Sequence, residues 1–210
     1  MYVLESPRRT ESKHENGMPS NHPHHDQQHG DQHQCNCSKT VTASQSLDEL
    51  EFERGIWTAA IDNEEHKLRS LIAKGHLHDR DNSGYTALHY AARSGHLSIC
   101  RILLDAGIGV DEQTHGGVTA LHRAAMMGHL EIVNLLLTRK TDPFVQDSDG
   151  KTALHRAAEK CYPEVCRSLL QHSPSLATVR DCKGKVPLEL VSQQSTHYQR
   201  LIEQFDACCG

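Results

Sequence analysis

The sequence predicts an all-α solenoid of helix–turn–helix units with β-turn fingers over residues 48–205, preceded by a disordered tail over residues 1–47. Two observations predict this fold: a unit of 33 residues recurs in register, and the composition changes near residue 47. Such a period is typical of stacked units, because no single unit can bury its apolar face alone. The aromatic content of only 4% disfavours a β-sandwich or barrel, because sheets favour aromatic residues.

Residues 1–47 differ in composition from the rest of the chain. They hold six of the 17 histidines and five glutamines, and very few aliphatic residues. Such a segment cannot bury enough apolar surface to offset the entropy of ordering its backbone, which costs about 1–2 kcal/mol per residue. We therefore expect this tail to be disordered.

Composition also bounds the compartment and the partners. The chain has eight cysteines, no apolar secretory segment at its start and no run of 18 apolar residues. We therefore expect reduced thiols in the cytoplasm or nucleus. The net charge of −5 argues against nucleic acid and membranes as partners, because both attract basic surfaces. We expect a monomer whose partner is another protein.

Three central units carry the most regular pattern. The stretch Gly84–Ala92, GYTALHYAA, recurs as GVTALHRAA at Gly117–Ala125 and as GKTALHRAA at Gly150–Ala158. The glycine predicts a tight turn with positive φ, and the threonine two residues later predicts a helix N-cap. The alanine pair keeps the first helix thin, so that neighbouring units approach closely. Leucine pairs at the same interval, such as Leu136-Leu137, predict the apolar stripe of a second helix.

Degenerate copies of this pattern flank the central units. Trp57–Ala60 leads to Leu71 and Gly75 at the same internal spacings, and Gly184–Leu190 opens a last unit one residue late. We therefore expect five units, with a C-terminal tail after them. Their predicted ranges are 48–80, 81–113, 114–146, 147–180 and 181–205, and the tail spans 206–210.

The fourth unit departs from its sisters between its two helices. It carries Cys161-Tyr162-Pro163 where they carry Gly-His-Leu. Proline suits the first position of the second helix. Cysteine adopts positive φ less readily than glycine, so this loop is predicted to be the weakest of the three.

These residues resemble the ankyrin repeat, whose pattern is a Gly-x-Thr-Pro-Leu-His turn followed by Ala-Ala, Gly-His and Leu-Leu. The resemblance covers residues 48–205, and it departs where Ala87, Ala120 and Ala153 replace the proline of the turn. It implies a non-catalytic protein–protein interaction module or adaptor. It also implies a concave binding surface made of the turn tips and the first helices.

The side chains left free to vary on that surface lie around each turn glycine and just after each alanine pair. Met126 and Met127 stand out there, because the corresponding residues are Arg93-Ser94 and Glu159-Lys160 and stacking demands no apolar side chain. They predict an exposed apolar patch beside Tyr85 and Val118. The alternative is that both methionines shield the second helix of their own unit. The predicted partner-binding residues are Tyr85, Tyr90, Arg93, His115, Val118, Arg123, Met126, Met127, Lys151, Arg156, Glu159 and Lys160.

The sequence contains no motif for catalysis. It has no phosphate-binding loop, no His-Glu-x-x-His and no Gly-x-Ser-x-Gly. His89, His122 and His155 follow the period of the repeat, so we expect each to hydrogen-bond the backbone of its own or the next unit. We therefore predict neither an enzyme, a cofactor nor a metal site in the repeats.

An alternative function lies in the tail. Residues 22–37 read HPHHDQQHGDQHQCNC, and imidazole and thiolate are ligands of zinc and copper. The spacing Cys35-x-Cys37 is not that of the usual two-residue knuckle. A metal-binding or metal-responsive protein is therefore the second hypothesis, beside a solvated segment without such a role.

Overall fold

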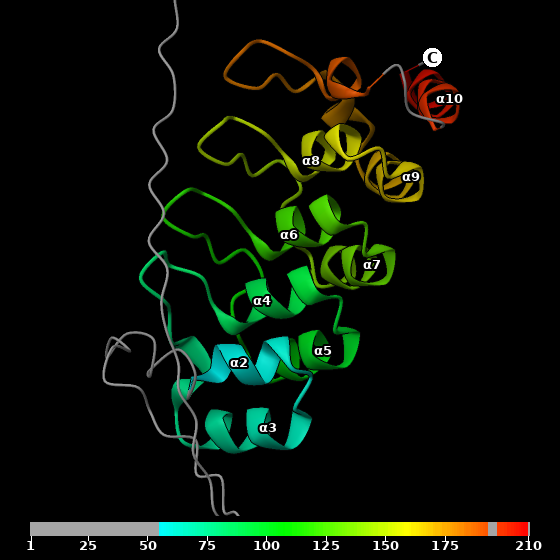
Figure 1. The fold of residues 1–210 in the computed structure, drawn as a ribbon. Coiled ribbons are helices and arrows are strands. Elements are labelled where there is room, and N and C mark those ends of the chain that lie inside the picture. Colours follow the sequence, from blue (N-terminus) through cyan, green and yellow to red (C-terminus); the bar gives the residue numbers. More distant parts are fainter. Residues whose placement is uncertain (1–54, 193–196, 210) are drawn as a thin grey trace, which may run out of the picture. The chain divides into compact units, whose positions relative to one another are not determined.

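The computed structural model describes residues 55–192 and 197–209, and these residues form helices and turns without any strand. The tail predicted to be disordered, residues 1–47, lies outside them, as does the metal-binding segment of the second hypothesis. Figure 1 shows helices stacked in two columns, with loops projecting on the side of one column. The prediction of an all-α repeat stack is confirmed for this part of the chain.

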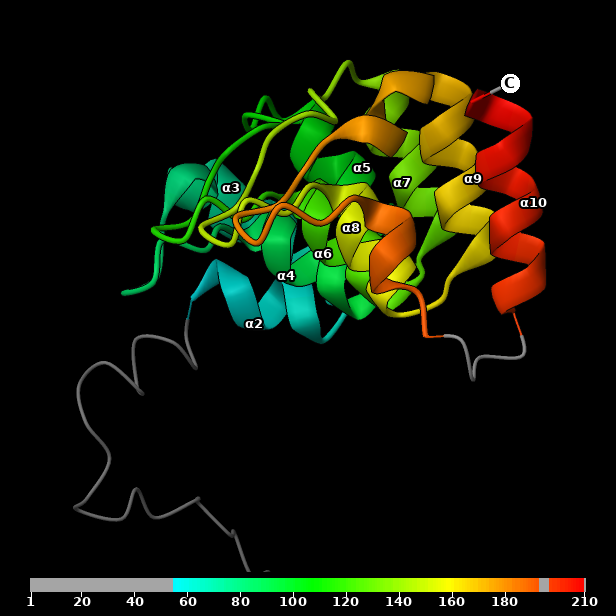
Figure 2. The same ribbon diagram turned by 90° about the horizontal axis from the view of Figure 1, so that it is seen from above.

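Each of the first four units contributes a first and a second helix. The first helices are α2 (Ile56–Ile61), α4 (Ala87–Ser94), α6 (Ala120–Met127) and α8 (Ala153–Glu159). The second helices are α3 (Glu65–Ala73), α5 (Leu97–Asp105), α7 (Leu130–Thr138) and α9 (Pro163–His172). In the view from above, the loops lie beyond one end of the first helices, and the second helices form the back of the stack (Figure 2).

The last unit differs from the others. A short 3-10 helix, η3 (Pro187–Leu190), stands in place of its first helix, and Val186 occupies the cap position that threonine holds in the second, third and fourth units. Two more 3-10 turns, η1 (His76–His78) and η2 (Pro174–Thr178), follow α3 and α9. The final helix, α10 (Tyr198–Cys209), packs against α9 and continues past residue 205, where the sequence pattern placed the end of the last unit.

The first helices begin as the sequence predicts. The turn glycines Gly84, Gly117 and Gly150 have φ of 81°, 71° and 71°. The threonines Thr86, Thr119 and Thr152 are the N-caps, each paired with the histidine three residues later in a capping box.

The same histidines join neighbouring repeats. The Nδ1 atom of His89 accepts the backbone N–H of Thr86 at 3.2 Å, and Nε2 donates to the carbonyl of Val118 in the next repeat at 2.9 Å. His122 makes the equivalent bond to Lys151 at 2.9 Å, and His155 to Lys185 at 3.2 Å. Burial lowers the pKa of all three rings, that of His89 to about 4. Each ring is therefore neutral at pH 7, and the prediction of a backbone role is confirmed.

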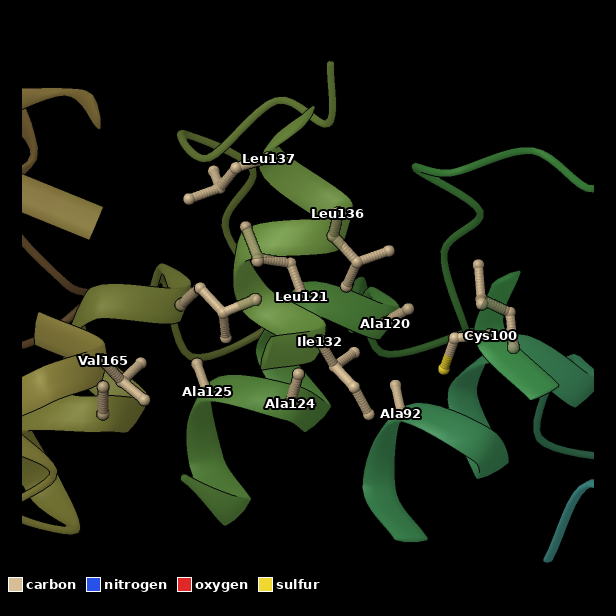
Figure 3. Close-up of a cluster of buried hydrophobic side chains, with 14 of the residues drawn as sticks. Ala92, Cys100, Ala120, Leu121, Ala124, Ala125, Ile132, Leu136, Leu137 and Val165 are labelled. Carbon is tan, nitrogen blue, oxygen red and sulfur yellow. The ribbon is translucent and has the colours of Figure 1, made fainter. Parts of the chain in front are cut away.

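The core runs continuously between the two columns of helices. Figure 3 shows Ile132 and Leu136 of the third repeat between Ala92 of the second and Val165 of the fourth. Cys100 and Cys166 are fully buried in this core, and burial raises the pKa of the Cys100 thiol to about 12. Both cysteines therefore pack in this core as small apolar residues.

Successive loops are joined by backbone hydrogen bonds near their tips. The N–H of His115 donates to the carbonyl of Ser83 at 3.1 Å, and the N–H of Ser148 donates to Gly116 at 2.8 Å. The N–H of Cys182 donates to Asp149 at 2.9 Å in the same way. These bonds fix the spacing of the loops beside the first helices.

Candidate functional site

The surface predicted to bind a partner consists of the finger turns 81–86, 114–119 and 147–152 and the first helices α4, α6 and α8 that follow them (Figures 1 and 2). We call it the finger face. The residue that opens each turn holds its shape. The Oδ1 atom of Asp81 accepts the N–H groups of Ser83 and Tyr85, both at 2.8 Å, and Asp147 does the same in its own turn. In the third repeat a hydroxyl takes this role, and Thr114 Oγ1 accepts the N–H of Val118 at 3.1 Å.

The second carboxylate oxygen of the turn meets a residue of the first helix. In the second repeat, the Tyr90 hydroxyl donates to Asp81 Oδ2 at 2.6 Å. Burial and this carboxylate raise the pKa of Tyr90. In the fourth repeat, Arg156 Nε donates to Asp147 Oδ2 at 2.8 Å. Each of these two helices is thereby tied to its own finger.

Arg156 is the centre of an ion cluster. Besides Asp147, whose side chain is completely buried, it contacts Asp149 at 2.9 Å and Glu159 at 3.6 Å. Lys151 Nζ also contacts Glu159, at 3.1 Å. The structure therefore brings together Lys151, Arg156 and Glu159, three of the residues predicted to bind a partner.

Arg123 occupies the corresponding position in the third repeat, and its surroundings differ. Its Cζ atom lies 4.7 Å from the centre of the Tyr85 ring, and its Nη2 donates to the Tyr85 hydroxyl. Its Nε atom is buried and has no hydrogen-bond acceptor within residues 55–192 and 197–209. Burial, together with the positive charge of Arg156, lowers the pKa of Arg123. The predicted residues Tyr85 and Arg123 thus form a clasp between the second and third repeats.

The two methionines differ in exposure. Met127 is 42% exposed at the end of α6, whereas Met126 is half-buried. Tyr85 is half-buried beneath Arg123, and Val118 is half-buried before the start of α6. An eight-residue helix is about 12 Å long, so Val118 and Met127 lie at opposite ends of α6. Of the four predicted apolar residues, only Met127 is exposed, and it lies at the other end of α6 from Val118.

The remaining predicted residues, Arg93, His115 and Lys160, are exposed. Arg93 and Lys160 stand at the ends of α4 and α8, on either side of the methionine pair in the stack. Neither cation makes an ion pair with any residue that the structure describes. The ends of the first helices therefore combine one exposed apolar side chain with uncompensated positive charge.

Sequence reasoning missed the residues that open the finger turns, Asp81, Thr114 and Asp147. These residues recur at intervals of 33, and each precedes by nine positions a first-helix residue that can reach it. Both features are visible in the sequence and could have identified them. It also missed Phe144, which is 42% exposed in the loop after α7. No feature of the pattern distinguishes Phe144 from an ordinary loop residue.

The described parts of the chain contain no group of three or more His, Cys, Asp or Glu residues that could hold a metal ion. None of the helices in the described ranges has the length and apolar character needed to cross a membrane.

Comparison with known proteins gives consistent matches. The family model described as ankyrin repeats in three copies matches residues 56–147 and 121–204. The chain is similar to ankyrin repeat domain-containing protein 39 of Homo sapiens, with 47% identity over 79 residues, which is 37% of this chain and 43% of the relative. It is similar to the Bos taurus protein of the same name, with 51% identity over 53 residues, or 25% and 29% of the two chains. The aligned segments span less than half the length of either relative.

Proposed function

Because this chain belongs to the ankyrin repeat family, we propose that it is a non-catalytic protein–protein interaction module that acts as an adaptor. Ankyrin repeats generally mediate protein–protein interaction. A stack of repeats offers a long surface whose frame is fixed and whose exposed side chains vary. On this chain the partner segment lies along the finger face, across the second, third and fourth repeats.

The observation that carries this placement is the exposure of Met127. It is 42% exposed at a position where the second and fourth repeats have Ser94 and Lys160. The repeat frame therefore requires no apolar side chain there, and contact with a partner would account for the methionine. Methionine adapts its shape to apolar partners, and arginine, present one helical turn away at position 123, is a frequent interface anchor.

The substitution Met127→Lys tests this placement. Lysine occupies the corresponding position in the fourth repeat, so the frame accepts it. We expect an unchanged melting temperature and a loss of about 2 kcal/mol or more in partner binding, the scale of an interface hot spot. The measurement is affinity capture with the full chain as bait, followed by titration of the captured partner.

Phe144→Ser is the matched control. Phe144 is also 42% exposed, but it lies in the loop after α7 rather than at the end of a first helix. Proteins captured by the wild type and by Phe144→Ser, and lost with Met127→Lys, support the proposal. Equal capture by all three chains contradicts it.

A further inference from the structure

Three carboxylates surround Arg156, and none of them has a counterpart around Arg123. Asp147, Asp149 and Glu159 contact the Arg156 guanidinium. Thirty-three residues earlier, the corresponding positions around Arg123 hold Thr114, Gly116 and Met126. The third repeat therefore has the same arginine but an uncharged residue at each of the three anionic positions.

Among the residues that the structure describes, the Arg123 guanidinium consequently has no paired anion. Its hydrogen bond to the Tyr85 hydroxyl and its contact with the Tyr85 ring orient it but do not neutralise it. No carboxylate within residues 55–192 or 197–209 forms an ion pair with it, and the lowered pKa agrees with that. A partly buried charge is unfavourable unless it is paired, so an external anion gains more here than at an exposed arginine.

Met127 follows Arg123 by one turn of α6. Positions 123 and 127 are four apart on α6, so their side chains lie on the same face of the helix, one turn from each other. In an extended peptide, alternate side chains point the same way and are about 6.7 Å apart. Two such side chains match the spacing of one helical turn.

We propose that Arg123 binds the carboxylate of an acidic, extended segment of the partner, and that an apolar side chain two residues away packs on Met127. This inference rests on the proposed function and specifies the partner. It is a peptide segment in which Asp or Glu lies two positions from a large apolar residue. The planar guanidinium fork fits a carboxylate, and Tyr85 holds it in place. The exposed cations Arg93 and Lys160 add positive charge in the repeats on both sides.

The first experiment selects peptides from a displayed library of random sequences on the full chain. We expect enrichment of an Asp or Glu two positions from Leu, Ile, Phe or Met. Arg123→Gln should weaken the selected peptides at least about tenfold, as loss of one partner of a desolvated charge pair does. Arg101→Gln removes the same charge from the exposed surface of α5 and should leave their affinity unchanged.

The second experiment supplies the missing anion from within the chain. Thr114→Asp places a carboxylate where Asp147 holds Arg156 in the fourth repeat. We expect a melting temperature equal to or above that of the wild type, and at least about tenfold weaker binding of the acidic peptide, because the two carboxylates compete for Arg123. Thr114→Asn is the control, because it offers the turn the same hydrogen-bond acceptor without charge and should bind like the wild type.

The outcomes separate this inference from the function on which it rests. Peptides that depend on Met127 but not on Arg123, peptides without an acidic residue, or full binding by Thr114→Asp would overturn the inference and leave the interaction surface standing. A library that yields no peptide sensitive to Met127→Lys counts against the proposed function and the inference together.

Discussion

The third and fourth repeats share a backbone and differ in how their side chains are paired. Both begin their first helix with a threonine cap, and both donate a histidine N–H to the next finger. In the fourth repeat the arginine of that helix is neutralised by its own repeat, whereas in the third it contacts Tyr85 and pairs with no carboxylate of the described ranges. The backbone of a repeat can thus stay constant while its arginine is paired with carboxylates in one copy and with a tyrosine in another.

The loops between the two helices differ as well. The third repeat has Gly128 there with φ of 78°, and the fourth has Cys161 with φ of 58°. The left-handed region suits glycine and is unfavourable for a residue with a Cβ atom. The fourth repeat therefore pairs its arginine with its own carboxylates but has a strained backbone in this loop.

The largest expected effect tests the stacking that both repeats share. Leu136 is fully buried in α7, which packs against α5 on one side and α9 on the other. Leu136→Ala should lower the free energy of unfolding by about 2–5 kcal/mol. Leu201, in α10, is equally buried but packs on one side of the stack only, so Leu201→Ala should cost less. Chemical denaturation measures both. Equal losses would contradict the nearest-neighbour description of the stack.

The next prediction concerns the histidines that join the repeats. The pKa of His89 falls from its ordinary value of 6.5 to about 4 in the folded chain. Between these two values the unfolded chain binds more protons than the folded one, so the free energy of unfolding decreases as pH falls from 6.5 to about 4. A shift of this size corresponds to roughly 3 kcal/mol for His89, and His122 and His155 shift in the same direction.

The measurement is the free energy of unfolding from pH 7.5 to 4, together with the titration of the His89 ring by NMR. A stability that stays constant over this window would show that the ring can be protonated without leaving its place between the repeats.

The smallest expected effects compare the two inter-helix loops directly. Gly128→Ala places a Cβ at positive φ and 2.7 Å from the Tyr162 ring, and should cost about 1–2 kcal/mol. Cys161→Gly relieves the same conformation in the fourth repeat and should stabilise the chain by about 0.5–1 kcal/mol after the added freedom of the unfolded chain is counted. Thermal melts measure both. Cys161→Ala separates backbone strain from the thiol, and it should leave stability unchanged if the backbone alone matters.

Much of the fold could be predicted from the sequence because it depends on local, periodic features. The turn glycines, the threonine caps and the bridging histidines recur at 33 residues, and each acts within its own repeat or on the next one. The end of the last helix was less predictable, because α10 follows no copy of the pattern and η3 follows only a degenerate one.

The finger face was only partly predictable. Its residues could be located by their positions in the repeat, but their pairing depends on contacts across repeats. Arg123 and Tyr85 are 38 residues apart, so their contact follows from no local pattern. That the third repeat lacks carboxylates around its arginine is recognised only once the ion pairs of Arg156 are known. Met126 and Met127 are adjacent in sequence, and which of them is exposed depends on how α6 is rotated against its neighbours.

The clasp between Arg123 and Tyr85 sets how many such sites the stack can have. Its cation comes from the third repeat and its ring from the second, so the site belongs to a junction and not to a single repeat. If the segment 114–146 were duplicated in tandem, the second copy of the arginine would face Val118 of the first copy in place of a tyrosine. Lengthening the array would therefore multiply arginines without multiplying clasps, and copy number alone would not create a second equivalent site.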